Sequence, residues 1–232
     1  MRSLLRHAVL TAAMCSTAAG TALAQTMPVS DEVRRQIDRV TASEQRANAG
    51  QPPAKVMDAV GVKPGMVIGE LGAGRGRYTV HLAGRVGASG KVYANDIDAE
   101  ALAYLRERCV RENLTNVEII LGTVDDPRFP AGRLDMVFMV WVYHMLEHPA
   151  TILKNIVPAL KAGATVVMVE PIPSETEAEI KMVTAHTGKT PTDIHVVTRT
   201  NLAADAALAG LDLVQAMEGF LEKDNIYILR KR

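Results

Sequence analysis

The sequence predicts an α/β fold, with a doubly wound, mostly parallel seven-stranded sheet that ends in a C-terminal antiparallel hairpin. Short apolar runs alternate with helical patterns, which is typical of a parallel sheet covered on both faces. One run breaks into three glycines spaced by two, as where a buried strand turns into a nucleoside-binding loop. The 232 residues, 48% hydrophobic and 22% charged, are enough for one well-buried core.

The predicted elements follow in order along the chain. A short helix is expected at 54–60, and a Pro-Gly turn leads into the first strand. Strands are predicted at 66–71, 91–95, 117–121, 135–140 and 164–170, with helices at 98–113, 149–160 and 200–209. The last two strand candidates, 211–219 and 225–230, can form the antiparallel hairpin.

Residues 1–24 differ in composition from the rest of the chain. Two arginines, Arg2 and Arg6, precede the apolar stretch 8–14, and Ala22-Leu23-Ala24 stands before Gln25. This pattern is typical of a secretory signal peptide cleaved after Ala24. A membrane anchor fits less well, because the apolar run is shorter than the roughly 20 residues that span a bilayer. We expect a periplasmic or secreted protein that has no membrane attachment after cleavage.

The mature chain is predicted to contain a polar helical arm, residues 25–53, and one catalytic domain, residues 54–232. Cleavage would leave Cys109 as its single cysteine, so no intramolecular disulfide is expected. The whole chain has 26 basic and 26 acidic residues. Residues 1–24 hold two arginines and no acid, so the formal net charge of the mature chain is 24 minus 26, or minus two. This balance gives no sign of a nucleic-acid partner.

The glycine loop carries the functional argument. Its glycines are at positions 72, 74 and 76, with Glu70 two residues before the first. A dinucleotide fingerprint reads G-x-G-x-x-G, but Arg77 follows the third glycine here, which therefore comes one residue early. Asp96 ends the second predicted strand, where a carboxylate can accept both hydroxyls of a ribose. The alternative role for Asp96 is to cap the following helix, but Asp98 is already expected to do so.

These motifs, together with Leu-Asp-Met-Val-Phe at 134–138 and Leu-Lys-Ala-Gly-Ala at 160–164, resemble the ordered motifs of class I S-adenosylmethionine-dependent methyltransferases. The resemblance runs from about residue 53 to residue 228 and implies a Rossmann-like methyltransferase fold, here in an exported protein. It also implies S-adenosyl-L-methionine as cofactor. This cofactor carries a sulfonium and an ammonium, so an acid beside the loop suits it better than it suits the anionic pyrophosphate of NAD.

The resemblance also implies a set of cofactor-binding residues. The loop amides face the methionine part, Glu70 lies near its amino group, and Asp96 holds the ribose. On the adenine side Val124 can pack on the base, and Asp125 can contact the adenine amine, although 125–127 is equally an ordinary turn sequence. The complete predicted set is Glu70, Gly72, Ala73, Gly74, Gly76, Asp96, Ile97, Val124 and Asp125.

Four residues after the fourth and fifth strands are candidates for catalysis. His144 matches a histidine common in the family at this place and can act as a general base, and Tyr143 can orient an acceptor. Glu170 ends the fifth strand, and His195 follows later; either can accept a proton during methyl transfer. Structural roles in packing or hydrogen bonding are the alternative for His144, Glu170 and His195.

Missing signatures narrow the chemistry. The Asp/Asn-Pro-Pro-Tyr/Phe motif of many base and amide N-methyltransferases is missing after the fourth strand, and one mature cysteine excludes the multi-thiol site of arsenite methyltransferases. No cluster of histidine, cysteine and acidic residues has metal-ligand spacing, so no metal is expected. We therefore expect methyl transfer to oxygen, carbon or nitrogen of a small-molecule acceptor.

Two other classes of function stay open. One is a non-catalytic periplasmic protein that binds S-adenosylmethionine or a nucleoside. The other is an NAD-type Rossmann enzyme, which the glycine spacing and the charge of Glu70 disfavour.

Overall fold

The computed structural model describes residues 31–172 and 197–232. The predicted signal peptide and His195 lie outside these ranges. The chain divides into a compact unit that ends at Val40 and a second unit, residues 41–232. Helix α1 (Asp31–Gly50) runs through this division, and its range falls within the predicted arm. The boundaries predicted for the arm and the catalytic domain stay a prediction.

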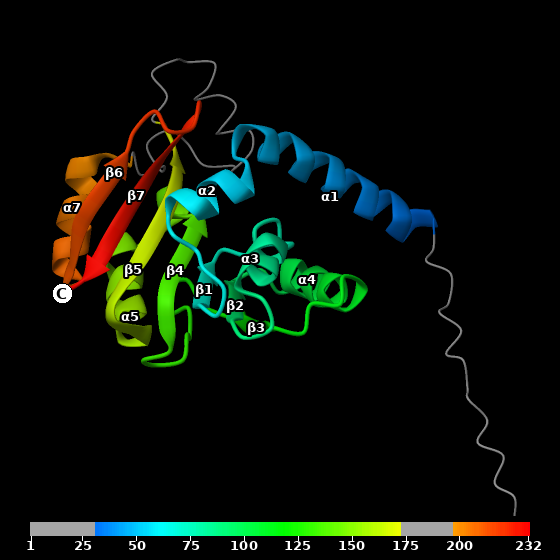
Figure 1. Ribbon diagram of the computed structural model, residues 1–232, viewed down its shortest axis with the longest axis horizontal. Coiled ribbons are helices and arrows are strands. Elements are labelled where there is room, and N and C mark those ends of the chain that lie inside the picture. The colour runs from blue at the N-terminus through cyan, green and yellow to red at the C-terminus, as the bar shows by residue number, and fades with distance from the viewer. Residues whose placement is uncertain (1–30, 173–196) are drawn as a thin grey trace, which may run out of the picture. The chain divides into compact units, whose positions relative to one another are not determined.

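The second unit contains one seven-stranded sheet in the order β3-β2-β1-β4-β5-β7-β6 (Figure 1). Neighbours among the first five strands pair in parallel, whereas β7 is antiparallel to both β5 and β6. The predicted α/β sheet and its antiparallel hairpin are therefore confirmed. The strands are β1 (Val67–Leu71), β2 (Lys91–Asp96), β3 (Val117–Leu121), β4 (Leu134–Val140), β5 (Leu160–Pro171), β6 (Leu211–Met217) and β7 (Asp224–Lys231).

The helices connect and cover these strands. They are α2 (Pro53–Ala59), α3 (Thr79–Val86), α4 (Ala99–Arg111), α5 (Pro149–Ile156) and α7 (Arg199–Leu208), with short 3₁₀ turns η1 (Tyr143–Met145) and η2 (Val157–Ala159). Asp98 caps α4 as expected, accepting from the amides of Glu100 at 2.8 Å and Ala101 at 3.1 Å. Within the described ranges, no helix is long and apolar enough to cross a membrane.

The fourth helix-to-strand connection differs from the sequence prediction. The helix expected through residue 160 ends at Ile156, and β5 begins at Leu160 rather than at residue 164. Pro158 has no amide hydrogen to continue the helix, so the chain passes through η2. The side chain of Lys231 then donates to the carbonyls of Val157 at 3.0 Å and Leu160 at 2.8 Å, which holds the new strand start.

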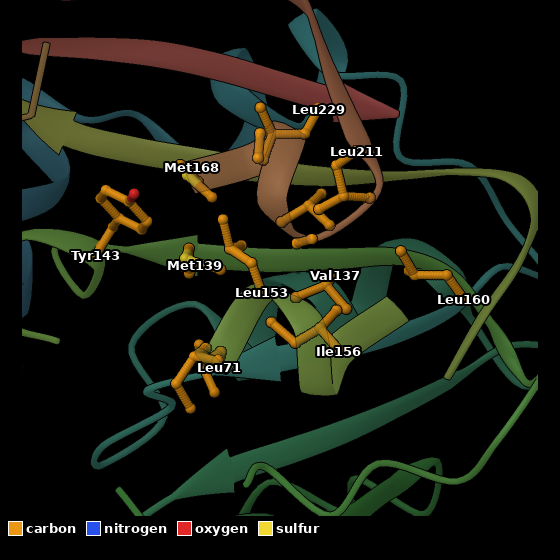
Figure 2. Packing of buried hydrophobic residues seen from close by; sticks show 14 of the residues in the cluster. Leu71, Val137, Met139, Tyr143, Leu153, Ile156, Leu160, Met168, Leu211 and Leu229 are labelled. Atoms are coloured by element: carbon orange, nitrogen blue, oxygen red, sulfur yellow. The ribbon is translucent and has the colours of Figure 1, made fainter. Parts of the chain in front are cut away.

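Two large apolar clusters pack against the sheet, one on each face. On β4, Val137 and Met139 belong to one cluster, and Met136 and Phe138 belong to the other, because successive strand side chains point to opposite faces. Figure 2 shows side chains of α5 lying beside Val137 and Met139 of β4. Burial on both faces fixes the register of the central strands.

The strand order reverses between β1 and β4. The chain moves outward from β1 through β2 to β3, then returns to place β4 on the opposite side of β1. Ligands of doubly wound sheets bind beside the carboxyl ends of the strands at such a reversal. The start of β7 lies at this same edge, because Asn225 pairs with Glu170 in antiparallel register.

Candidate functional site

The glycine loop after β1 is shaped by a different constraint at each glycine. A Cβ atom at Gly72 would lie 2.3 Å from Val142, and one at Gly76 would lie 2.4 Å from Leu105. At Gly74 a Cβ atom would meet nothing within 4 Å, but the φ angle of +54° is one that L side chains rarely adopt. Gly74 thus leaves the loop backbone open to a ligand.

Asp96 holds this loop against the end of β2. Its Oδ2 atom accepts from the amide of Gly74 at 2.7 Å, and its Oδ1 accepts from Asp98 at 2.9 Å. The amide of Ala73 donates to the carbonyl of Asn95 at 2.8 Å. Each carboxylate oxygen of Asp96 still has a free lone pair. The half-buried side chain can therefore accept from ribose hydroxyls while it keeps the loop in place.

Glu70 is a buried acid directly below the loop. Thr79, at the start of α3, donates its hydroxyl to Glu70 at 2.6 Å. Burial raises the pKa of Glu70 from 4.5 to about 8, against the smaller opposing effects of the Thr79 hydrogen bond and the charge of Arg77. A cationic group placed beside Glu70 would favour the carboxylate, as the ammonium of S-adenosylmethionine would.

Glu170 and His144 form a buried pair at the ends of β5 and β4. The fully buried Glu170 accepts from the amides of Val142, Tyr143 and His144 at 3.1, 2.8 and 3.3 Å. Its Oε2 atom also lies 2.6 Å from Nδ1 of His144. Because a carboxylate only accepts, the imidazole donates through Nδ1 and keeps the lone pair of Nε2. The arrangement can orient His144 as a general base.

Tyr143 is buried in the apolar core. Its side chain is 2% exposed and belongs to the apolar cluster formed with α5 and α7 (Figure 2). Its hydroxyl donates to Asp205 on α7, and burial and that carboxylate raise the pKa of the phenol. The hydrogen bond to Asp205 anchors the phenol, and the predicted role of Tyr143 in orienting an acceptor stays a prediction.

Exposed apolar side chains gather at the carboxyl ends of the parallel strands. Among the described residues, this group ends or follows β2, β3, β4 and β5, and its members are Ile97, Leu121, Val124, Trp141, Met145 and Ile172. Ile97 and Val124, both predicted to bind the cofactor, are 59% and 42% exposed. Apolar surface at this edge suits a flat adenine ring and an apolar acceptor.

The segment after β3 forms a turn that is closed between Thr123 and Asp126. The amide of Asp126 donates to Oγ1 of Thr123 at 3.0 Å, and the Thr123 amide donates to the Asp126 carbonyl at 2.9 Å. Asp125 is half-buried, and its Oδ1 atom lies 2.8 Å from Nδ1 of His148. The adenine contact of Asp125 stays a prediction, as does the catalytic role of His195, which lies outside the described residues.

Two positioning residues were not predicted from the sequence. Asp205 receives the hydroxyl of Tyr143, and Asp224 accepts from Nε1 of Trp141 at 2.6 Å. Both acids lie more than sixty residues from their partners along the chain, so no local pattern could identify them. In the part of the chain that the structure describes, no group of three metal-ligating side chains could hold a metal ion.

Residues 68–163 match a family model described as a methyltransferase domain. A demethylmenaquinone methyltransferase of Lactococcus lactis subsp. lactis is 32% identical over 117 residues, 50% of this chain and 46% of that protein. A nocamycin O-methyltransferase of Saccharothrix syringae is 34% identical over 83 residues, 36% of this chain and 30% of that protein. The chain thus spans at most about half the length of these curated relatives.

A crystal structure of an S-adenosylmethionine-dependent methyltransferase from Aquifex aeolicus is similar to this one, with a TM-score of 0.67 and 24% identity. The match covers 78% of this chain and 89% of that chain, and it shows the fold. The comparisons confirm the predicted Rossmann-like methyltransferase fold. Residues 68–163 are thus similar to methyltransferase domains, which agrees with the predicted enzyme class and cofactor.

Replacing Glu70 with glutamine should stabilise the protein increasingly as the pH rises from about 5 to about 8. The unfolded chain loses this proton near pH 4.5 and the folded chain near pH 8, so wild-type stability falls between these values. A glutamine at position 70 does not gain or lose a proton in this pH range, and its side-chain oxygen still accepts the hydrogen bond from Thr79. Urea unfolding of Glu70→Gln and wild type across this range measures the gain.

The exposed Glu100→Gln on α4 is the control and should show no such pH-dependent gain. A difference between Glu70→Gln and wild type that stays constant with pH would contradict the raised pKa of Glu70.

Proposed function

We propose, on the premise of the methyltransferase domain at residues 68–163, that this protein transfers a methyl group from S-adenosyl-L-methionine to a small-molecule acceptor. The glycine loop, Asp96 and Glu70 fit the cofactor by the contacts they leave open. Gly74 leaves room for a ligand, and Asp96 keeps free lone pairs. The buried acid Glu70 suits a cationic amino group.

The buried Glu170–His144 pair is the observation that carries the proposal of catalysis. A protein that only binds the cofactor has no need of an imidazole fixed by a fully buried carboxylate at the carboxyl end of its sheet. Glu170 fixes both the backbone turn η1 and the imidazole through the same side chain. The ring is therefore held in one tautomer, with Nε2 left to accept a proton.

The chemistry divides between the cofactor and the chain. S-adenosyl-L-methionine supplies a methyl group already activated by its sulfonium, so the protein mainly provides alignment and a dry pocket. Nε2 of His144 takes the proton that the acceptor loses as its oxygen, nitrogen or carbon becomes nucleophilic. Glu170 holds the proton on Nδ1 and stabilises the imidazolium that forms.

The acceptor we favour is an apolar molecule with an acidic O–H or C–H group. The exposed apolar side chains at the sheet edge, among them Trp141 and Ile172, favour an apolar body. His144 favours a group that must lose a proton. The names of two relatives, a demethylmenaquinone methyltransferase and a nocamycin O-methyltransferase, agree with this class of acceptor.

Calorimetric titration of the purified protein should show binding of S-adenosylmethionine and S-adenosylhomocysteine, and none of NAD. Asp96→Ala should weaken binding about 10- to 100-fold, because it removes a charged acceptor of ribose hydroxyls. Gly74→Val should abolish binding, because a β-branched residue is strained at this φ angle and its side chain enters the ligand space.

Asp212→Ala is the matched control, since this acid lies on β6 and pairs with Arg232 at 2.7 Å. Absence of binding to the wild-type protein would overturn the cofactor assignment. Binding of NAD instead would point to a Rossmann-type enzyme of another class.

Replacing His144 with alanine should lower kcat about 10²- to 10⁴-fold, because the general base is lost, and should leave S-adenosylhomocysteine affinity unchanged. Candidate acceptors are first identified by a mass gain of one methyl group. Glu170→Gln should shift the pH profile of kcat, since it changes the partner of Nδ1.

His81→Gln on α3 is the histidine control for this test. Full activity of His144→Ala would show that methyl transfer needs no base from this residue. Cofactor binding without turnover of any acceptor would favour a non-catalytic binding protein.

Export is the second part of the proposal. The basic start, apolar centre and Ala22-Leu23-Ala24 of residues 1–24 support secretion to the periplasm or beyond. A charged cofactor made in the cytoplasm does not cross a membrane unaided. The exported enzyme therefore needs a delivered supply of S-adenosylmethionine, or it acts before export.

The exported protein should begin at Gln25 when its N-terminus is sequenced from the periplasm or medium of a bacterial host. Ala24→Leu should block cleavage at this position, because the peptidase requires a small residue there, whereas Thr21→Ser should be cleaved normally. Recovery of an uncleaved wild-type chain from the cytoplasm alone would contradict export.

A further inference from the structure

The position of the turn η1 depends on contacts from other elements of the fold. The turn has three residues, and a 3₁₀ turn of this length has poor hydrogen-bond geometry of its own. It carries His144, the proposed general base, so the orientation of the turn decides where Nε2 of the imidazole points. Strand β5 contacts the turn through Glu170, and helix α7 contacts it through Asp205.

The contacts from β5 all meet at one carboxylate. Oε1 of Glu170 accepts from the amides of Val142 at 3.1 Å and Tyr143 at 2.8 Å. Oε2 accepts from the amide of His144 at 3.3 Å and lies 2.6 Å from its Nδ1. These bonds hold the turn against β5. Because they converge on a single group, the rotation of the turn about that group has to be set by a second contact.

The side chain of Tyr143 provides this second contact. It runs from the turn into the apolar cluster and is 2% exposed (Figure 2). Its hydroxyl donates to Oδ2 of Asp205, which lies 62 positions further along the chain. Burial and the charge of Asp205 raise the pKa of Tyr143, so the phenol stays protonated and remains a donor. The contact lies at the end of a rigid ring, where it resists rotation of the turn.

Asp205 stands on a helix that is itself well fixed. Helix α7 is capped by Thr198, which accepts from the amide of Asn201 at 3.1 Å, and it packs against α5 and β6. Its buried side chains, Leu202 and Ala206, are apolar and give the phenol no direction. Asp205 is the one acidic residue of α7, and its hydrogen bond is directional. A group on a rigid helix can therefore fix the orientation of Tyr143.

We propose that Asp205 is a positioning residue for methyl transfer, which acts through Tyr143 on the orientation of His144. An apolar pair of similar size would pack at this place without desolvating a carboxylate. The hydrogen bond of Tyr143 to Asp205 thus contributes a defined position more than it contributes stability. The inference rests on the proposed function, in which Nε2 of His144 takes the proton of the acceptor. A residue that only stabilised the fold would behave differently in the tests that follow.

The first test measures kcat with an acceptor identified by its gain of one methyl group. Tyr143→Phe keeps the ring and removes the hydroxyl, and Asp205→Ala removes the acceptor of that hydroxyl. Each should lower kcat about 10-fold, because the base is misplaced, and should change S-adenosylhomocysteine affinity less than about 2-fold. The double variant should be no slower than the slower single variant, since both remove the same contact. Asp205→Asn still accepts from the phenol and should recover most of kcat.

The same change in a chain without the base separates positioning from stability. In the His144→Ala background, Tyr143→Phe should change kcat less than about 2-fold, because no imidazole is left to position. An equal loss of kcat in both backgrounds would overturn the proposal, as would unchanged kcat of Tyr143→Phe in the wild-type background. Tyr93→Phe on β2, in the same apolar cluster, is the matched control and should keep wild-type kcat. Thermal unfolding of each variant confirms that it is folded.

The second test needs no acceptor. In protein labelled with ¹⁵N-histidine, the ring of His144 should show one neutral tautomer, with its proton on Nδ1, and His144→Ala assigns the signal. Tyr143→Phe and Asp205→Ala should each give a mixture with the Nε2–H tautomer, and an unchanged tautomer in both would overturn the proposal. Full activity of His144→Ala is a failure of the proposed function instead. The tautomer then still decides whether Asp205 positions the imidazole.

Discussion

The carboxylate of Glu170 is the constraint on which the arrangement of the candidate site depends. It accepts three successive amides at the start of η1 and pairs with the imidazole of His144. One buried side chain at the end of β5 therefore fixes the loop that follows β4. An acid so deeply buried is costly unless every lone pair has a donor, and here the backbone turn supplies those donors. The same contacts that satisfy Glu170 also orient His144.

The rest of the site follows the same principle of buried polar groups that satisfy one another. Asp96 accepts from the amide of Gly74 in the glycine loop and from that of Asp98 before α4, and Thr79 donates to Glu70. The hydroxyl of Tyr143 anchors η1 to Asp205 on α7. Among the described residues, Nε2 of Gln51 is a buried side-chain donor without a hydrogen-bond partner. The satisfied groups hold the loops at the carboxyl edge of the sheet.

Sequence reasoning succeeded where the signal was local. The cap at Asp98, the glycines of the loop and the apolar strands depend on residues within a few positions of one another, so the pattern predicts them. It failed at Pro158, where a helix predicted to continue gave way to a 3₁₀ turn and an early strand. It also could not choose between two roles for Asp125, because the turn and the adenine contact use the same residues.

The sequence by itself determined the doubly wound sheet, the glycine loop and its partner Asp96, because hydrophobic periodicity and backbone conformation are properties of short segments. Only the tertiary structure decided what each polar side chain faces. Glu170 meets His144 across 26 positions, and Arg77 meets Gln51 across the same number. Tyr143 turned out to face Asp205. Such pairings depend on how strands and helices pack, and no local pattern carries that information.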